Sequence, residues 1–313
     1  MTTNKYNLPK ALVRAISKDS HRAGGDLSTT QLLKSPREFW LSVRHSSEIE
    51  EDAISKLWAL FGTASHSIAE RGETENSLVE EYLKAEFNGV KLTGMADLYE
   101  DGILWDYKTV SVCGVLLLDP QKKAQLIGQL NTYAYMLKKQ GMEVKGLRIL
   151  DIMRDWVASK AKFDPKYPDF QAQVIEIPLF TEQQQLQYIF ARIERLMKYK
   201  KTPDDELPLC TEAYRWARGG AFKVYKGTNK TAVRGGANLS SQEDAEKFIQ
   251  TLDPKFKYRI EEKKGDLFKR CEYCSARKFC NQTQYTEVEW RREHQNIKVE
   301  MGFNQFMEET KQW

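Results

Sequence analysis

Residues 94–109 read GMADLYEDGILWDYKT, and this stretch carries the clearest fold signal in the chain. The Asp-Gly pair at 101–102 is typical of a two-residue type I′ hairpin turn, because both central positions of that turn require positive φ. If the pair forms the loop, Asp97 lies opposite Asp106, with their Cβ atoms about 4.5–5.5 Å apart. Side chains alternate along a strand, so Lys108 emerges on the same face as Asp106. The hairpin therefore predicts two carboxylates and one cation on a single surface.

Two carboxylates at that separation repel each other unless a positive charge lies between them. Divalent cations such as Mg²⁺ bind carboxylate oxygens, and a neighbouring lysine can stabilise the negative charge that grows in a transition state. The hairpin thus holds the minimum set of groups for binding a divalent metal ion and stabilising an anionic transition state.

The hairpin belongs to a longer antiparallel meander, with strands expected at 78–87, 90–100 and 103–110 and a second turn, Asn-Gly, at 88–89. Helical periodicity marks the segments on either side, and the helix before the meander carries an apolar face with Trp58 and Phe61. This order predicts an α/β fold in which a mixed central β-sheet is flanked by helices. The other expected elements are helices at 28–44 with a break at Pro36, 50–71, 121–140 and 181–201, and strands at 144–151 and 174–178.

The composition of the chain indicates a folded protein. It has 313 residues, of which 41% are hydrophobic and 29% charged, so we expect a packed core rather than disorder. It has no run of about 18 apolar residues, and residues 1–20 lack the apolar segment of a secretory signal. We therefore expect a cytoplasmic protein without a membrane partner.

Residues 213–236 contain six basic side chains and no acidic one, with four aromatic residues among them. Basic groups can follow phosphates and aromatic faces can stack on bases, so one interpretation of this basic hairpin is DNA binding. The other interpretation is a solvated hairpin with a few core aromatics. The basic residues are Arg215, Arg218, Lys223, Lys226, Lys230 and Arg234.

Three short motifs occur in an order and spacing that resemble those of a known protein superfamily. Asp97 followed by Asp106-x-Lys108 resembles the signature of the PD-(D/E)XK nuclease superfamily. Residues 62–66, GTASH, resemble the Gly-x-x-x-His helix of its RecB-like branch, and residues 129–133, QLNTY, resemble the Gln-x-x-x-Tyr motif that follows the active-site strands. Taken alone, His66 could equally seal its helix against the core, and Gln129 could be solvated beside a packed Tyr133. The order and spacing of these motifs are the specific signal. The resemblance as a whole covers most of residues 27–282.

The resemblance implies a restriction-endonuclease-like core and a set of site residues. It implies that Asp97, Asp106, His66 and the main-chain carbonyl of Tyr107 bind Mg²⁺ or Mn²⁺. Lys108 would orient a water molecule or stabilise negative charge, and the Gln129–Tyr133 pair would contact a phosphate or support the lysine. The implied reaction is hydrolysis of DNA phosphodiester bonds to 5′-phosphate products.

The chain has five cysteines, and four of them suggest a metal site because disulfides are rare in a reducing compartment. The spacing Cys-x2-Cys-x5-Cys resembles the C-terminal staple of AddB-type and CRISPR-associated RecB-like nucleases, which hold a 4Fe–4S cluster with one distant cysteine. The fourth ligand here would lie after the core rather than before it, and four thiolates also suit Zn²⁺. Cysteines without a metal are a third alternative. The four candidates are Cys210, Cys271, Cys274 and Cys280.

These features predict three regions: residues 1–202 as a nuclease core with N-terminal helices, 203–285 as the basic hairpin and metal-binding cysteine extension, and 286–313 as a tail. The leading expectation is a DNA exonuclease of phage-type recombination or repair, in the cytoplasm of a bacterial host. Its expected partners are DNA, a single-strand annealing or recombination protein, and copies of itself in a homo-oligomer. The alternatives are a CRISPR-associated nuclease and a non-catalytic, zinc-stapled DNA-binding protein.

Overall fold

The computed structural model describes residues 2–17, 24–72, 74–75, 77–116, 120–217 and 219–284. The chain divides into two compact units between Leu207 and Pro208. This division lies at the end of the segment 200–207, where the composition changes. Across the described ranges, no helix is long and apolar enough to cross a membrane.

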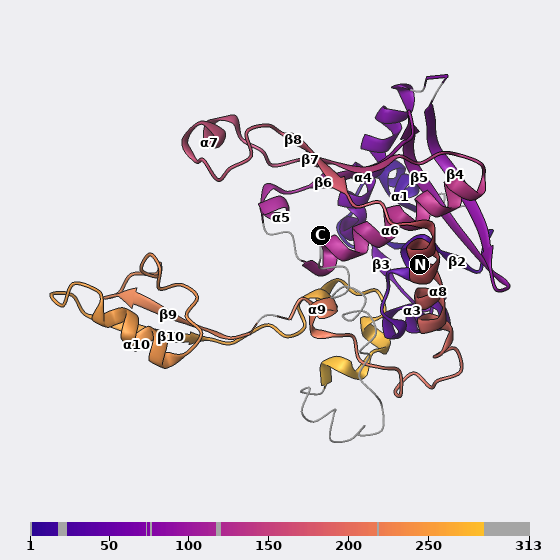
Figure 1. Ribbon diagram of the computed structural model, residues 1–313. Helices are drawn as coiled ribbons and strands as arrows, with labels where there is room; N and C mark the ends of the chain where they lie inside the picture. Colours follow the sequence, from indigo (N-terminus) through magenta and orange to yellow (C-terminus); the bar gives the residue numbers. More distant parts are fainter. Residues whose placement is uncertain are drawn as a thin grey trace. The chain divides into compact units, whose positions relative to one another are not determined.

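The first unit is a mixed α/β unit with helices on a central sheet (Figure 1). Its elements are β1 (Thr2–Thr3), α1 (Lys10–Ser17), β2 (Leu27–Ser28), α2 (Thr29–Leu32), α3 (Pro36–Arg44), β3 (Glu51–Asp52), η1 (Ala53–Lys56), α4 (Leu57–Ala69), η2 (Glu70–Gly72), β4 (Ser77–Phe87), β5 (Val90–Glu100), β6 (Ile103–Val110), α5 (Val112–Leu116), α6 (Pro120–Lys139), β7 (Gly146–Met153), α7 (Ala158–Phe163), β8 (Ala172–Ile177) and α8 (Glu182–Met197).

The meander forms where the sequence predicts it. Asp101 and Gly102 have φ values of 51° and 83°, as a type I′ turn requires, and Leu98 pairs with Trp105 in the expected register. The central sheet runs in the order β2-β5-β6-β7-β8, with β4 also paired to β5. Since β6 pairs with β7 in parallel while β4–β5, β5–β6 and β7–β8 are antiparallel, the sheet is mixed.

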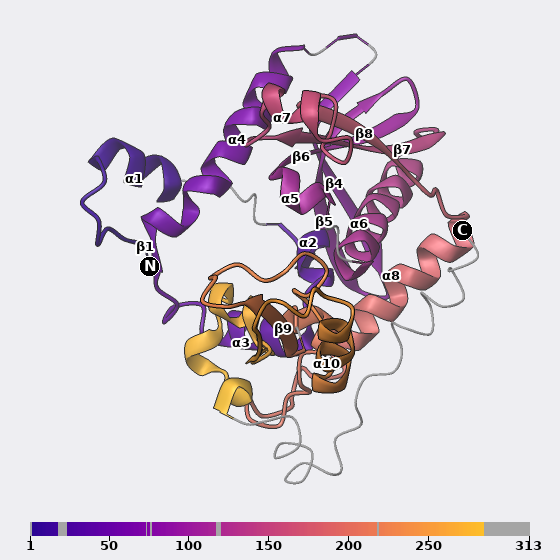
Figure 2. The same ribbon diagram turned by 90° about the vertical axis from the view of Figure 1, so that its left-hand side faces the viewer.

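Helix α6 packs on the sheet, and α8 packs against α6 and also contacts α2 and α3 (Figure 2). Apolar side chains of α6, among them Leu130 and Met136, are fully buried. The two helices approach closely because α6 carries a glycine at the crossing: a Cβ atom on Gly128 would lie 2.1 Å from the hydroxyl of Tyr188 in α8. Helix α8 begins where the sequence predicts it, and a capping box at Thr181 opens it.

The apolar face expected for the helix before the meander is only partly buried. The helical segment exists as η1, α4 and η2, but Trp58 is 64% exposed and Phe61 is 51% exposed. The guanidinium of Arg154 lies 4.5 Å from the centre of the Trp58 ring, and the two aromatic rings pack edge to face. Periodicity predicted the helix correctly but overestimated how much of its face the unit covers.

The second unit contains a small sheet backed by a helix. Its elements are α9 (Glu212–Arg215), β9 (Ala221–Lys226), α10 (Gln242–Gln250), β10 (Tyr258–Lys263), η3 (Lys269–Tyr273), η4 (Arg277–Phe279) and η5 (Asn281–Gln284). Strand β9 pairs antiparallel with β10 rather than with the residues that directly follow it, which reach β9 through isolated bridges at Ala232 and Leu239. The expected basic hairpin is therefore one arm of a sheet closed by a more distant strand.

The end of α3 is tied to the segment before the unit boundary by an ionic cluster. His45 Nε2 lies 2.7 Å from Asp204 Oδ2, its Nδ1 lies 2.9 Å from Glu48 Oε1, and Arg44 Nη1 lies 2.5 Å from Asp204 Oδ1. The hydrogen bond to Asp204 and then that to Glu48 raise the pKa of His45 above its ordinary value of 6.5. Both ring nitrogens face carboxylates, so the doubly protonated imidazolium fits this cluster best.

We expect His45→Gln to lower the free energy of unfolding more at pH 6 than at pH 9. The folded-state pKa lies above the unfolded value, so the imidazolium contributes stability below about pH 6.5 and loses it as pH rises through the folded pKa. Urea unfolding of both proteins at the two pH values measures the difference. An equal loss at both values would show that the charge of His45 contributes nothing.

Candidate active site

Two different strands, β2 and β6, pair with the same edge of β5, and a gap lies between their two ladders. We call this edge the split edge of β5. Strand β2 pairs with this edge at residues 92–93, β6 pairs with it at residues 98–100, and β4 covers the other edge. In the registers of these described strands, residues 94–97 fall between the two ladders. The amide of Met95, inside this interval, hydrogen-bonds to the hydroxyl of Tyr133 from α6. The split therefore leaves main-chain groups and side chains of β5 available beneath α6.

Asp97 and Asp106 lie close to this split, although they are not an opposed ladder pair as the hairpin predicted. The ladder of β5 and β6 ends one pair earlier, and Asp97 Oδ2 instead accepts a 2.8 Å hydrogen bond from the amide of Tyr107. A carboxylate that takes the place of a main-chain acceptor lets the two strands diverge. Both acids still act electrostatically on Lys108, so the structure brings the three charged groups together.

Lys108 and Asp106 form a short ion pair, with Lys108 Nζ 2.6 Å from Asp106 Oδ2. Asp106 is only 2% exposed, and among the described residues its Oδ2 accepts no hydrogen bond of good geometry. Burial lowers the pKa of Lys108, but the carboxylates of Asp106 and Asp97 outweigh it, so the net shift is upward. Lys108 therefore stays charged around neutral pH. It forms an ion pair with the buried carboxylate of Asp106, whose Oδ2 accepts no other well-formed hydrogen bond among the described residues.

Gln129 and Tyr133 meet on one face of α6, as their spacing predicts. Gln129 Nε2 donates a 3.2 Å hydrogen bond to the Tyr133 hydroxyl, and burial raises the pKa of that hydroxyl. The Tyr133 ring lies directly against β5, because a Cβ atom on Gly94 would lie 2.4 Å from Tyr133 Cε1. Glycine at this position thus admits the tyrosine that closes the split.

Asp151 belongs to the same cluster, although no motif in the sequence assigns it a functional role. It pairs in parallel register with Lys108 across β6 and β7, is 8% exposed, and accepts a 3.3 Å hydrogen bond from Gln173. Burial raises the pKa of Asp151 against the opposing effects of Gln173, Lys122 and Lys108. The signal in the sequence is an acid set among the apolar residues of the segment 149–153.

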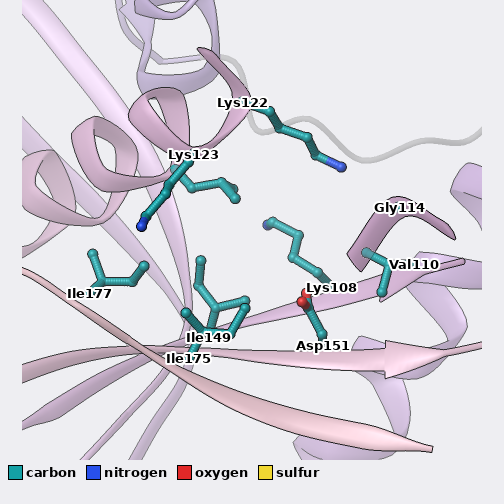
Figure 3. A pocket seen from close by; sticks show the side chains of 10 residues that line it. Lys108, Val110, Gly114, Lys122, Lys123, Ile149, Asp151, Ile175 and Ile177 are labelled. Carbon is teal, nitrogen blue, oxygen red and sulfur yellow. The ribbon is translucent and has the colours of Figure 1, made fainter. Parts of the chain in front are cut away.

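A hollow opens beside these groups, and Figure 3 shows Lys108 and Asp151 among the side chains that line it. Lys122 and Lys123 reach it from α6, while Ile149 and other aliphatic side chains form its apolar part. The spacing of the motifs gave no hint of these two lysines. Lys108 lines the hollow, so a ligand bound there would also contact Lys108.

Two site predictions fall wholly or partly outside what the structure describes. His66 lies in α4, but its side chain is outside the described residues, so its predicted metal contact stays a prediction. Arg218 is also outside them. Within the described part of the chain, no three His, Cys, Asp or Glu side chains are grouped so that they could hold a metal ion.

The four candidate cysteines all lie in the second unit, and two interactions relate three of them. Cys210 exchanges two main-chain hydrogen bonds, of 3.1 and 3.0 Å, with the side chain of Gln282, which follows the cluster by two residues. Burial raises the pKa of Cys271, and the nearby Cys280 raises it further. The thiols of Cys271 and Cys280 are thus neighbours, and Cys210 is tied to the end of the same segment.

The predicted DNA-contacting residues fall into two groups. Arg215 differs from the prediction of a phosphate contact, because it is 3% exposed and its guanidinium donates to the carbonyls of Cys210 and Leu267. It holds the second unit together. Lys226 lies over the ring of Phe256. The more accessible members are Lys223, Lys230 and Arg234, of which the last two are exposed.

Comparison with known proteins adds little to this description. No protein-family model matches the chain, and no curated protein matches it. Solved structures with a related chain path include that of a protein named SSO0001, at 18% sequence identity and a TM-score of 0.40, over 61% of this chain and 86% of that one. A similarity at this level carries no inference about fold or activity.

Proposed function

We propose that the chain is a Mg²⁺- or Mn²⁺-dependent deoxyribonuclease with a restriction-endonuclease-like core, acting as an exonuclease on linear DNA. The observation that carries the proposal is the cluster at the split edge of β5, where Asp97, Asp106 and Lys108 meet. The Gln129–Tyr133 pair, expected beside these groups from motif order alone, lies on the helix above them. Five residues from three separate segments are therefore brought to one place.

The acids are suited to the proposed metal. Mg²⁺ is commonly bound through one or two carboxylates and completes its coordination with water and substrate phosphate oxygens, so a group of three protein donors is not required. Asp106 Oδ2 is a buried oxygen with a poorly directed cationic neighbour, and a divalent ion would satisfy it. When bound, the ion would polarise the scissile phosphate and acidify a water molecule.

The chain's own groups would divide the remaining work. Asp97 and Asp106 bind the ion, and the Tyr107 amide holds Asp97 in place through its 2.8 Å hydrogen bond. Lys108 would stabilise the negative charge that develops on the phosphate. Tyr133 and Gln129 fix the edge of β5 and thereby the position of Asp97.

The test is degradation of linear duplex DNA that carries a label at the 5′ or the 3′ end. We expect release of labelled products with Mg²⁺ or Mn²⁺ and none with a chelator, and the label released first gives the polarity. A covalently closed circle should resist the enzyme. Binding without degradation in every metal tested would reject the nuclease and favour the non-catalytic alternative.

The cysteine extension is proposed as a structural metal site, with an iron–sulfur cluster as the first choice and zinc as the second. The described thiols do not form a closed metal-binding group, so the proposal rests on the cysteine spacing and on the two proximities given above. It assigns the metal no part in the reaction.

We expect protein purified without oxygen to contain iron and sulfide and to show the visible absorption of an iron–sulfur cluster. Cys280→Ser should remove the metal and destabilise the second unit, because a structural metal site contributes folding free energy directly. Cys113→Ser is the control, since that thiol is exposed in the first unit. If the purified protein is colourless and contains stoichiometric zinc, the site is a zinc site rather than an iron–sulfur site. If the purified protein contains no metal, both assignments are wrong.

A further inference from the structure

The hollow beside Lys108 is lined by cationic side chains, one acid and aliphatic side chains. Lys122 and Lys123 extend from the first turns of α6, and Lys108 and Asp151 rise from the sheet (Figure 3). Both α6 lysines are exposed, whereas Asp151 is 8% exposed. The hollow therefore combines two cations at the surface with a fixed lysine at depth.

The balance of charge around the hollow favours an anion. The lining of the hollow includes three lysines, Lys108, Lys122 and Lys123, and one acid, Asp151. That acid lies within electrostatic range of both Lys108 and Lys122. One acid among three lysines leaves the lining of the hollow with a net positive charge.

The apolar part of the hollow narrows the choice of anion. Aliphatic side chains such as Leu126 and Ile149 also line it. A bare inorganic anion gains nothing from apolar surface, whereas a nucleotide presents a phosphate and a deoxyribose that is largely hydrocarbon on one face. A nucleotide unit of a DNA strand matches both kinds of lining, because its phosphate suits the lysines and its sugar suits the aliphatic side chains at the hollow.

We propose that Lys122, Lys123 and the hollow form a second phosphate-binding subsite, which holds the phosphate of the nucleotide next to the scissile bond. The inference rests on the proposed function for the identity of the strand. The phosphate has two sources, an internal phosphodiester or the 5′-terminal phosphate of a DNA end. If the terminal phosphate is the occupant, the subsite also measures the distance from the strand end to the cleaved bond.

The test is binding of a fluorescent single-stranded oligonucleotide, with a 5′-phosphate or a 5′-hydroxyl, in the presence of Mg²⁺. All proteins carry Asp97→Asn so that the DNA remains intact, and that residue does not line the hollow. We expect Lys122→Ala/Lys123→Ala to weaken binding of the 5′-phosphorylated strand about tenfold. The slope of log affinity against log salt should fall by about 0.7 for each phosphate that is no longer paired with a lysine.

The matched control is Lys138→Ala/Lys139→Ala, which removes the same charge from the opposite end of α6. We expect it to leave the affinity within about twofold. If the 5′-hydroxyl strand binds the parent protein as weakly as the double variant binds the phosphorylated strand, the occupant is the terminal phosphate. If both strands lose affinity equally in the double variant, the occupant is an internal phosphodiester.

The subsite is overturned if Lys122→Ala/Lys123→Ala binds both strands as tightly as the control variant does. This outcome is separable from failure of the proposed function, because binding is measured without cleavage. A wild-type chain that never degrades DNA, yet binds it through Lys122 and Lys123, would reject the nuclease and retain the subsite.

Discussion

Lys108→Ala is expected to reduce metal-dependent DNA degradation by at least about 10²–10³-fold, the loss typical of removing one preorganised charge-stabilising group. The same change should destabilise the metal-free protein. It removes the cation that lies 2.6 Å from the carboxylate of Asp106, and this carboxylate is only 2% exposed. Breaking a buried ion pair costs roughly 3–5 kcal/mol, and the partial exposure of Lys108 places the expected cost at the lower end. Initial rates on labelled duplex and urea unfolding measure the two effects.

A second substitution separates catalysis from stability. Lys108→Ala/Asp106→Asn removes the stranded charge, so it should recover most of the lost stability while remaining inactive. Lys145→Ala is the control for loss of a lysine charge, because Lys145 and its partner Glu143 are both exposed and surface pairs contribute about 0–1 kcal/mol. A Lys108→Ala protein that degrades DNA at the wild-type rate would remove Lys108 from the reaction.

The elements around the meander were predictable because their signals are local. A type I′ turn constrains two adjacent φ angles, and Asp-Gly is among the few pairs that adopt them, so the turn fixes the register of Leu98 with Trp105. The same local logic predicted the break before α3, where Pro36 occupies the first helical turn, and the start of α8 at Thr181, where a capping box forms.

The parts of the site that escaped prediction depend on contacts between distant segments. Asp151 lies beside Lys108 only because β6 and β7, which are connected through α5 and α6, pair in parallel. No residue spacing specifies the register of that pairing. The departure of Asp97 from ladder pairing follows from a hydrogen bond to the Tyr107 amide that a regular hairpin would not contain. Local patterns define elements, whereas this site lies where the regular pairing of elements stops.

Arg215 shows the same limitation in the second unit. A run of basic and aromatic residues is equally compatible with a phosphate-binding surface and with a packed guanidinium. The structure buries Arg215 because the carbonyls of Cys210 and Leu267 need donors. No pattern of composition reveals the contact with Leu267, which lies 52 residues away in the sequence.

Gly128→Ala is expected to lower the free energy of unfolding by roughly 1–3 kcal/mol or more, the cost of overpacking a close-packed interior. Alanine has the higher helix propensity, so an isolated helix would be stabilised by the same change. Here the added Cβ would lie 2.1 Å from the hydroxyl oxygen and 2.3 Å from Cζ of Tyr188, which is 5% exposed. The crossing of α6 and α8 must widen, and because α6 carries Tyr133, activity should fall as well.

Two further variants identify the contact as the cause. Gly62→Ala is the matched control in α4, where nothing lies within 4 Å of the added Cβ, so stability should rise by roughly 0.5–1 kcal/mol. Replacing Tyr188 with Leu removes the ring that the new methyl group strikes, so Gly128→Ala should cost less in a Tyr188→Leu background than in the wild type. Equal costs in the two backgrounds would contradict the close crossing, and with it the placement of α6 over the split edge of β5.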